Sequence, residues 1–198
     1  MARLKSFDEQ STLRTLGKTF CELGYSATTY QNLQSSTGLT GRSLINAYGD
    51  KQDMYKLCLE SYLSDVEAER NDCLTPPNCA GILRFFKRLE SLPVNDLRQN
   101  GCLMVNAIHT SESQSEAVQA LISQFRSGFV SDFEMALDAD GILHPQQRAQ
   151  FLTVLLWGCA IEVRLSRNTH AVRPIRIEVD RLLRIWANEA NGHPETVR

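Results

Sequence analysis

The chain has 198 residues, 42% of them hydrophobic, which is enough for one full-sized core and a small appended module. Its net charge of −2 and its pI near 6.1 argue against a surface that is basic throughout. The first residues lack the apolar core of a signal peptide. The longest apolar stretch, Phe151 to Ile161, is shorter than the roughly 20 residues that cross a bilayer. We therefore expect a cytoplasmic protein.

A first helix is predicted over about 7–23. Leu16 and Phe20 lie on its apolar face, and Gly24 follows where a C-terminal cap is expected. The hydroxyls of Thr28 and Thr29 can cap a short second helix over about 30–36.

A third short helix is predicted over 41–48, with Thr40 as its cap. The fourth is long, reaches about residue 72 and is stopped by Pro76 and Pro77. Further apolar-periodic segments lie at about 79–92, 101–111, 115–138, 146–168 and 174–191. No alternating strand pattern is present, so the predicted fold class is all-α.

Residues 29–48 have the pattern of a helix-turn-helix, with two short helices joined by a turn that contains glycine. Three leucines are spaced to pack the two helices together, namely Leu33, Leu39 and Leu44. On the second helix, the side chains that point away from these leucines are those of Arg42, Ser43, Asn46 and Ala47. Arginine and asparagine are well suited to paired hydrogen bonds with guanine and adenine edges, so this helix is a candidate for reading DNA.

Charge is unevenly distributed between the two parts of the chain. Residues 1–56 carry seven Lys/Arg against five Asp/Glu, a net charge of +2, and the remainder has a net charge of −4. This modest asymmetry fits a DNA-binding module on an acidic body. The alternative reading of residues 29–51 is a pair of packed helices without DNA affinity.

The ordered spacing from the first helix to the start of the fourth resembles the N-terminal domain of the tetracycline-repressor (TetR) family. The matching residues are Phe20, Gly24-Tyr25, Thr28-Thr29, Gly38-Leu39-Thr40, Ser43-Leu44, Tyr48 and Lys51. The resemblance implies a three-helix DNA-binding domain over 1–50 and a helical ligand-binding and dimerisation domain over 51–198. It implies phosphate contacts at helix N-termini by Thr29 and Lys51. The expected DNA-binding residues are Thr28, Thr29, Thr40, Gly41, Arg42, Ser43, Asn46, Ala47, Tyr48 and Lys51.

Three positions depart from the family pattern. Arg42 replaces the usual glycine, Ile45 replaces a phosphate-binding tyrosine, and Tyr48 replaces phenylalanine. Losing one phosphate contact should weaken binding to all DNA sequences about equally, whereas Arg42 can add a contact to phosphate or base. The operator sequence is therefore not readable from relatives.

The last two predicted helices, 146–168 and 174–191, are apolar on more than one face, which suggests a four-helix interface between two copies. The alternative is that they are core helices of a monomer. A two-fold homodimer would set its recognition helices roughly 34 Å apart on a pseudo-palindromic, double-stranded DNA operator.

Aromatic and Met side chains of the body are candidates for a small-molecule pocket. The expected ligand-binding residues are Phe86, Cys102, Met104, His109, Phe125, Phe129 and Trp157. The segment 101–106 is similar to one in a subgroup of these regulators that includes sensors of electrophiles or oxidants. Cys102 is thus a candidate sensing thiol, whose pKa a helix N-terminus would lower. The subgroup's following acidic residue is absent, and a buried, inert thiol is the alternative.

The leading hypothesis is a repressor that a small-molecule effector releases from its operator. The alternatives are a redox or electrophile sensor that uses Cys102, and a helical interaction module that has lost DNA binding. No nucleophile with a base, carboxylate pair, phosphate loop or metal cluster is evident, so we expect neither an enzyme nor a metal or other cofactor. The six scattered cysteines are expected to be reduced.

Overall fold

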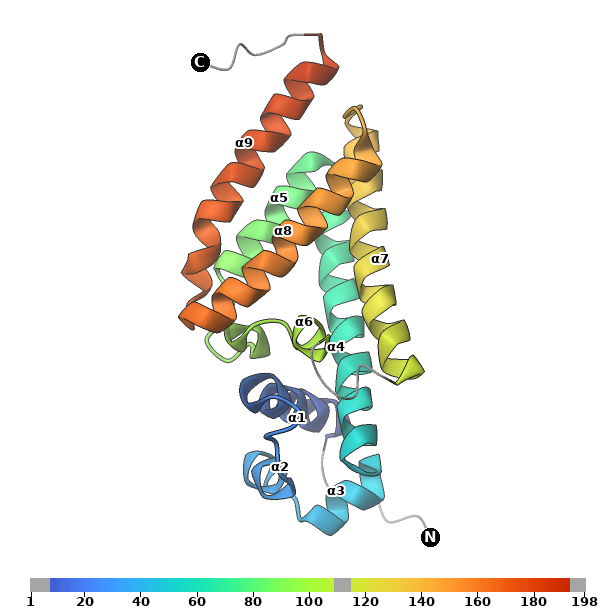
Figure 1. The fold of residues 1–198 in the computed structure, drawn as a ribbon, viewed down its shortest axis with the longest axis vertical. Coiled ribbons are helices and arrows are strands. Elements are labelled where there is room, and N and C mark those ends of the chain that lie inside the picture. The colour runs from blue at the N-terminus through green and yellow to red at the C-terminus, as the bar shows by residue number, and fades with distance from the viewer. Residues whose placement is uncertain (1–7, 109–114, 193–198) are drawn as a thin grey trace.

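The computed structural model describes residues 8–108 and 115–192, and every regular element within these ranges is helical (Figure 1). The all-α prediction is confirmed. In chain order the elements, with η for a 3-10 helix, are α1 (Glu9–Leu23), α2 (Tyr30–Thr37), α3 (Gly41–Tyr48), α4 (Lys51–Leu74), α5 (Cys79–Glu90), η1 (Leu97–Asn100), α6 (Leu103–Ala107), α7 (Glu116–Ala139), α8 (Pro145–Ser166), η3 (Thr169–Val172) and α9 (Arg173–Ala190).

The first four helices begin where the sequence offers a capping side chain. Asp8, Thr29, Thr40 and Asp50 each accept hydrogen bonds from backbone N–H groups in the first turn of α1, α2, α3 and α4. Such a cap contributes about 1 kcal/mol. Gly38 ends α2 at a φ of 70°, a left-handed conformation in which a Cβ would be strained. These local signals explain why the predicted bounds of the third helix, 41–48, are confirmed.

Helices α1, α2 and α3 pack with the N-terminal part of α4 into a small unit at one end of the molecule, which we call the head (Figure 1). Leu33 and Leu44 are fully buried between them. The Phe20 ring packs edge-on against Tyr55 with 5.1 Å between centroids, and Tyr55 lies 5.0 Å from the ring of Tyr25. Because α4 continues unbroken beyond the head, one helix contributes to both parts of the chain.

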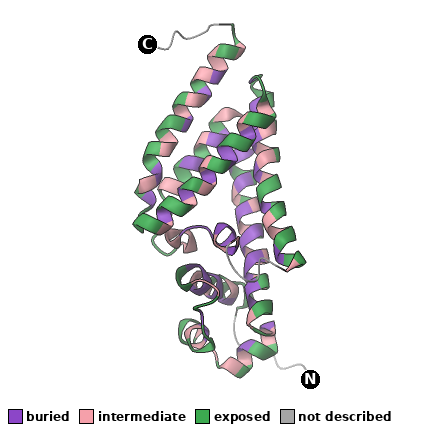
Figure 2. Ribbon diagram, viewed as in Figure 1, coloured by how far each residue is buried: buried purple, intermediate pink, exposed green. Residues whose placement is uncertain are grey.

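The remaining helices form the body, whose buried residues face inward from α4, α5, α7 and α8 (Figure 2). Aromatic rings fill its centre: the Phe125 and Phe129 centroids lie 5.1 Å apart, and Phe85 and Phe129 5.2 Å apart. Helix α9 lies against α5 and α8. The body is thus a bundle with an aromatic core.

Helix α8 has the length and hydropathy of a membrane span, with 33% of its most apolar window buried inside the protein. This hydropathy is a mean over the helix, whereas the uninterrupted apolar stretch within it, Phe151 to Ile161, is shorter than a span. Leu152, Leu156 and Val163 of α8 are buried in the bundle, and α8 packs along α7. Core helices of globular bundles can also reach this length and hydropathy, so these two properties alone do not identify a membrane span.

The predicted helix at 101–111 is wrong in its extent. The structure has η1 ending at Asn100 and only the short α6 over Leu103–Ala107. Gly101 separates them at a φ of 93°, and a Cβ there would lie 3.1 Å from the carbonyl oxygen of Ala160 and 3.0 Å from Cβ of Arg164. The close approach of α8 therefore imposes a turn on a segment whose apolar spacing alone suggested a helix.

Candidate DNA-binding head and ligand cavity

The turn between α2 and α3 is fixed by side-chain hydrogen bonds. The backbone N–H of Gly41 donates to Oε1 of Gln34 at 2.9 Å, and the N–H of Ser43 donates to the Thr40 hydroxyl at 3.2 Å. Both bonds satisfy N–H groups at the start of α3 that have no partner within the helix. The two helices are therefore held at a defined angle, as a helix-turn-helix requires.

Helix α3 has one buried face and one exposed face. Leu44 and Tyr48 are buried against α2 and α4, whereas Arg42 and Asn46 are exposed beside Ile45, which is 48% exposed. Such a short helix is stabilised by its packing, which leaves its outer face free to contact another molecule.

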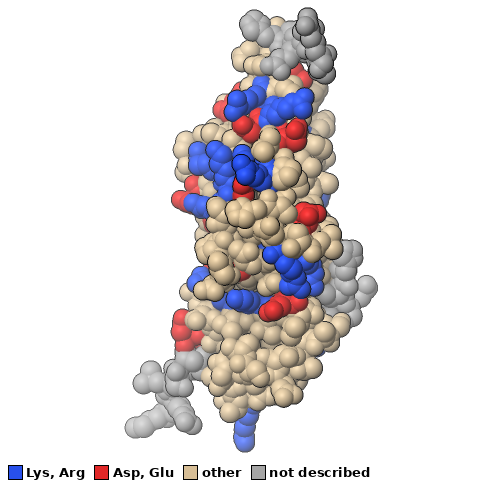
Figure 3. Space-filling model, turned by 90° about the vertical axis from the view of Figure 1, so that its left-hand side faces the viewer, with Lys and Arg blue, Asp and Glu red and all other residues tan. Residues whose placement is uncertain are grey.

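Arg42 is the one charged side chain in the segment that contains α2 and α3. Residues 23–49 contain no Asp or Glu. In Figure 3 the charged side chains gather in bands over the body, and the lowest part of the face shown has no acidic side chain. Carboxylates begin directly after α3, where Asp50 and Asp53 are exposed at the start of α4.

Two tyrosines position the predicted phosphate contact at Lys51. The backbone N–H of Lys51 donates to the Tyr30 hydroxyl oxygen at 3.1 Å, and its ammonium lies 4.3 Å from the centroid of the Tyr25 ring. The Thr29 hydroxyl caps α2 and donates to Oδ1 of Asn32 at 2.6 Å. Sequence reasoning missed the role of Tyr30 because the contact joins residues 21 apart.

Two of the ten predicted DNA-binding residues have internal roles. Thr28 is buried and its hydroxyl donates to the carbonyl oxygen of Gly24 at 2.6 Å. Tyr48 is also buried, and its hydroxyl donates to the carbonyl oxygen of Glu9 at 3.4 Å. Both side chains therefore hold the head together and do not face solvent.

The body contains a mainly apolar cavity of about 50 Å³ between α4, α5, α7, α8 and the segment 97–105. Four predicted ligand-binding residues line it: Cys102, Phe125, Phe129 and Trp157. Phe86 and Met104 are buried in the core and do not line this cavity. Their neighbours Phe85 and Val105 do, because adjacent helical residues point about 100° apart. His109 lies outside the described residues.

The cavity wall includes two polar residues that sequence reasoning did not select, Tyr62 and Arg98. Tyr62 lies on the buried, mainly apolar face of α4, and Arg98 lies in a connection without a sequence motif. A second, polar cleft of about 500 Å³ lies between α1, α4 and η1, and it shares with the cavity Tyr62, Val66 and Arg98. These three residues therefore form the wall between the body cavity and the cleft beside the head.

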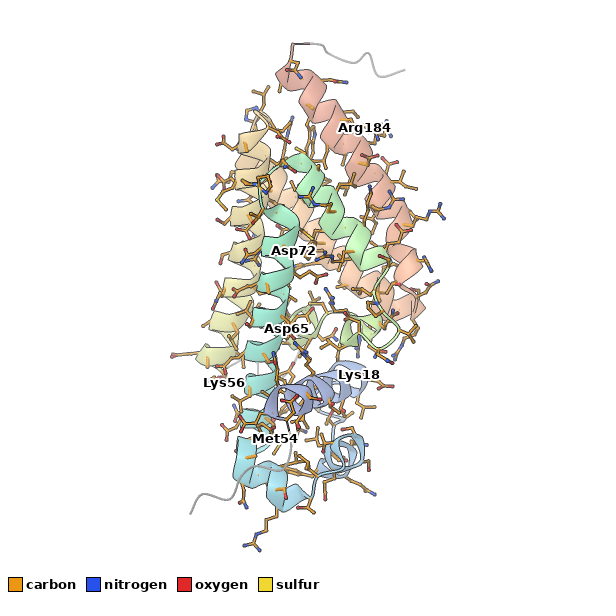
Figure 4. All side chains as sticks on the ribbon, turned by 180° about the vertical axis from the view of Figure 1, so that it is seen from behind. Lys18, Met54, Lys56, Asp65, Asp72 and Arg184 are labelled. Carbon is orange, nitrogen blue, oxygen red and sulfur yellow. The ribbon has the colours of Figure 1, made fainter. Side chains whose placement is uncertain are left out.

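Charged pairs line this cleft and join its sides. The Arg14 guanidinium of α1 pairs with Asp65 of α4 at 3.0 Å, and Figure 4 shows Asp65 where these helices meet. Arg98 donates to Glu69 of α4, and its Nη2 lies 2.7 Å from Asp96. Burial alone would raise the pKa of Asp96, but the hydrogen bonds and positive charge of Arg98 lower it below the ordinary aspartate value.

The predicted lowering of the Cys102 pKa is wrong. Burial raises the pKa of this thiol, and the opposing effects of the Tyr62 hydroxyl and of the Met104 and Val105 N–H groups do not offset it. The Tyr62 hydroxyl donates to Cys102 Sγ at 3.2 Å. Cys102 is therefore a buried, protonated thiol in this conformation.

The segment that carries Cys102 is tied to both the head and the body. Arg164 of α8 donates to the carbonyl oxygen of Cys21 at 2.7 Å and to that of Asn100 at 3.3 Å. The Cys21 thiol in turn donates to the carbonyl oxygens of Asn100 and Gly101 at 3.7 and 3.6 Å. A movement of the cavity wall near Gly101 would therefore alter the hydrogen bonds to Cys21 at the end of α1.

The chain is similar in sequence to known transcription regulators. No family model matches the chain. It is 30% identical over 111 residues to the HTH-type transcriptional regulator YezE of Bacillus subtilis, over 54% of this chain and 56% of the relative. It is 22% identical over 194 residues to the HTH-type transcriptional repressor ComR of Escherichia coli, over 93% of this chain and 91% of the relative.

Solved structures resemble the chain over almost its whole length. The TetR-family regulator CifR, a cysteine mutant in complex with operator DNA, matches with a TM-score of 0.73 and 22% identity, over 93% of this chain and 100% of that one. The chain has the TetR-family fold. Reduced NemR of E. coli gives a TM-score of 0.70 at 17% identity, over 88% and 97% of the two chains. A TetR transcriptional regulator of Legionella pneumophila matches with a TM-score of 0.74 and 16% identity, over 91% of this chain and 99% of that one.

The TetR-family fold agrees with the resemblance predicted from the spacing between Phe20 and Lys51. It combines the N-terminal helix-turn-helix with a C-terminal helical body, and both are present here (Figure 1). The YezE match spans only about half of that relative.

Proposed function

We propose that the chain is a dimeric transcriptional repressor that binds a pseudo-palindromic operator and is released from it by a small-molecule effector. The observation that carries this proposal is α3, a capped helix that buries Leu44 and Tyr48 and exposes Arg42 and Asn46 in a segment without Asp or Glu. The operator-bound CifR structure and the repressor ComR support it by similarity.

The proposed contacts divide into two groups. Arg42 and Asn46 enter the major groove, where their side chains can form paired hydrogen bonds with base edges. The remaining contacts position the head on the DNA backbone, through Thr29, Thr40, Gly41, Ser43, Ala47 and Lys51. Arg42 thus adds a side-chain contact at a position where the TetR-family pattern has glycine.

A second copy of the chain would cover the exposed apolar face of α8 and α9. Phe151, Val154, Ile161 and Leu165 of α8 are exposed, with Ile177 of α9. The four α8 side chains recur every three, four or seven residues and so form one stripe along the helix. The stripe also contains Gly158, which is exposed and has no atom within 4 Å of an added Cβ, so a partner helix can approach closely.

Effector binding would reach the head through the segment that joins it to the cavity. Cys102 and Gly101 line the cavity, and Arg164 ties this segment to the last turn of α1. A ligand that prefers a different position of this segment would shift the population away from the DNA-binding spacing of the two heads.

A gel-shift titration with the DNA directly upstream of the coding region tests the proposal. Arg42→Ala should lower operator affinity about tenfold, because a bidentate base contact contributes about 1–3 kcal/mol. Arg184→Ala is the matched control, since Arg184 is also exposed but lies far along α9 from the head (Figure 4). Absence of any sequence-specific, salt-sensitive complex with the unmodified protein would refute DNA regulation by this chain.

The Tyr62–Cys102 hydrogen bond supports a second candidate function, a thiol sensor within the same fold. Hydrogen peroxide would oxidise the Cys102 thiol to a sulfenic acid with release of water, which would remove that bond and move the segment tied to α1. The CifR and NemR structures concern a cysteine mutant and a reduced form of those proteins.

Cys102→Ser separates the two candidates. If Cys102 is the switch, the variant should keep its operator affinity and lose release by hydrogen peroxide in the gel-shift assay. Cys159→Ser is the matched control, because Cys159 is a second buried thiol of the same cavity. Peroxide release that survives in Cys102→Ser would exclude the thiol mechanism.

A further inference from the structure

The polar cleft beside the head is walled by one face of α1, one face of α4 and the residues 95–98. The lining residues of α1 are Ser11, Arg14, Thr15 and Lys18, and those of α4 are Tyr62, Asp65, Val66 and Glu69. Within each helix they recur every three or four residues, so they share one face. The volume of about 500 Å³ is within the range of small-molecule sites, roughly 300–1,000 Å³.

The carboxylates that line this cleft are already paired with guanidinium groups. Asp65 accepts hydrogen bonds from Nε and Nη2 of Arg14 at 3.0 Å each. Asp96 accepts from Nε and Nη2 of Arg98, whose Nη1 donates to Glu69. Such charge-assisted pairs are stronger than neutral hydrogen bonds, so a cation that entered the cleft would have to displace an arginine to reach a carboxylate.

The cations of the cleft, in contrast, keep unused donors. Neither the Lys18 ammonium nor Nη1 of Arg14 has an acceptor among the described residues. Both side chains reach solvent, since that of Arg14 is 54% exposed and Lys18 is partly exposed. They lie four residues apart on one face of α1, so their positive charges repel each other. An anion bound between them would offset this repulsion.

We propose that this cleft binds a small organic anion, whose carboxylate or phosphate group accepts hydrogen bonds from the Lys18 ammonium and from Nη1 of Arg14. The exposed Ser11 hydroxyl and Asn95 amide line the same cleft and can bind polar groups on the rest of the molecule.

The cleft lies between the head and the body. Figure 4 shows Lys18 on α1 and Asp65 on α4 in this region. Helix α1 separates the cleft from α2 and α3, so DNA bound at α3 would not fill it (Figure 1). A ligand there contacts the head through α1 and the body through α4 and residues 95–98. The site is therefore separate from the apolar cavity, and its occupation would link the two parts of the chain.

Four sugars that differ only at C6 isolate the charge of the ligand. Glucuronate has a carboxylate there and glucose 6-phosphate a phosphate, whereas glucose is neutral and 6-amino-6-deoxyglucose is a cation. Isothermal titration calorimetry of the free protein at low ionic strength, where screening is weak, measures their binding. We expect at least one of the two anions to bind at least about tenfold more tightly than glucose, and the cation not to bind. The tighter of the two anions identifies carboxylate or phosphate as the preferred group.

Lys18→Gln removes the positive charge and should lower the affinity for that anion about tenfold, the effect of losing one hydrogen bond between charged groups. Lys18→Arg keeps the charge and should retain most of the affinity. Lys56→Gln is the matched control, because Lys56 is an exposed lysine of α4 that does not line the cleft (Figure 4). This control should leave the affinity unchanged, and circular dichroism checks that each variant is folded.

The proposal is overturned if neither anion binds more tightly than glucose, if 6-amino-6-deoxyglucose binds as tightly as the anions, or if Lys18→Gln retains the native affinity. None of these measurements involves DNA. A failed gel shift would therefore refute DNA regulation without affecting this result, and a failed titration would leave DNA binding intact.

Discussion

Val154→Asp is expected to convert the proposed dimer into a monomer and to lower affinity for the full operator at least about 100-fold, which is the typical gain from linking two binding sites. Val154 is 64% exposed at the centre of the apolar stripe of α8. In a two-fold interface the same stripe faces its own copy, so the substitution would bury two carboxylates near each other. Sedimentation equilibrium measures the oligomeric state, and a gel shift measures the affinity.

The control for this substitution is Val94→Asp, which changes a valine that is 87% exposed in the connection before η1. This control should change neither the mass of the oligomer in sedimentation equilibrium nor the operator affinity in the gel shift. A half-site DNA should bind Val154→Asp and the native protein equally, because one head contacts it. A dimeric Val154→Asp with native operator affinity would rule out this face as the interface.

Arg98→Ala should lower the free energy of unfolding by about 3 kcal/mol near neutral pH, the low end of the range for breaking a buried ion pair. The substitution leaves Glu69 and Asp96, both mostly buried, without their main cation. Urea unfolding at fixed protein concentration, followed by circular dichroism, measures the change. Arg173→Ala is the matched control, since Arg173 is 67% exposed and its pair with Glu90 should contribute under about 1 kcal/mol.

The pH dependence of this effect has a defined sign. In the native protein the pKa of Asp96 is lowered, so its contribution to stability is present above the ordinary pKa of about 4 and is lost as the pH falls through the folded-state value. In Arg98→Ala the remaining burial raises that pKa, and protonation relieves the uncompensated charge. The stability difference between the two proteins should therefore shrink as the pH falls toward about 4. A difference that grows on acidification would contradict this account.

The head could be predicted from sequence because its signals are local. Thr40 caps α3 and Gly38 ends α2, and each acts within three residues of the helix end that it defines. The segment at 101–111 was misjudged because Gly101 meets α8, whose residues lie about 60 positions away. Local patterns cannot report such a contact.

The cavity was only partly predictable, for a related reason. Aromatic residues in the middle of helices suggested the right part of the body, and Phe125, Phe129 and Trp157 do line the cavity. Composition could not tell Phe85 from Phe86, since both are buried and only their direction differs. The burial that raises the pKa of Cys102 also depends on residues distant in sequence.

Helix α4 joins the head to the body as one continuous helix, with no linker between them. It runs through 24 residues, Lys51–Leu74, and a helix of that length is about 36 Å long. A tilt of about 5° at its body end would displace its other end by about 3 Å. That displacement is close to the spacing of roughly 3.4 Å between successive base pairs. In the proposed dimer, a small rotation of α4 on effector binding is therefore large enough to move each α3 out of register with its half-site.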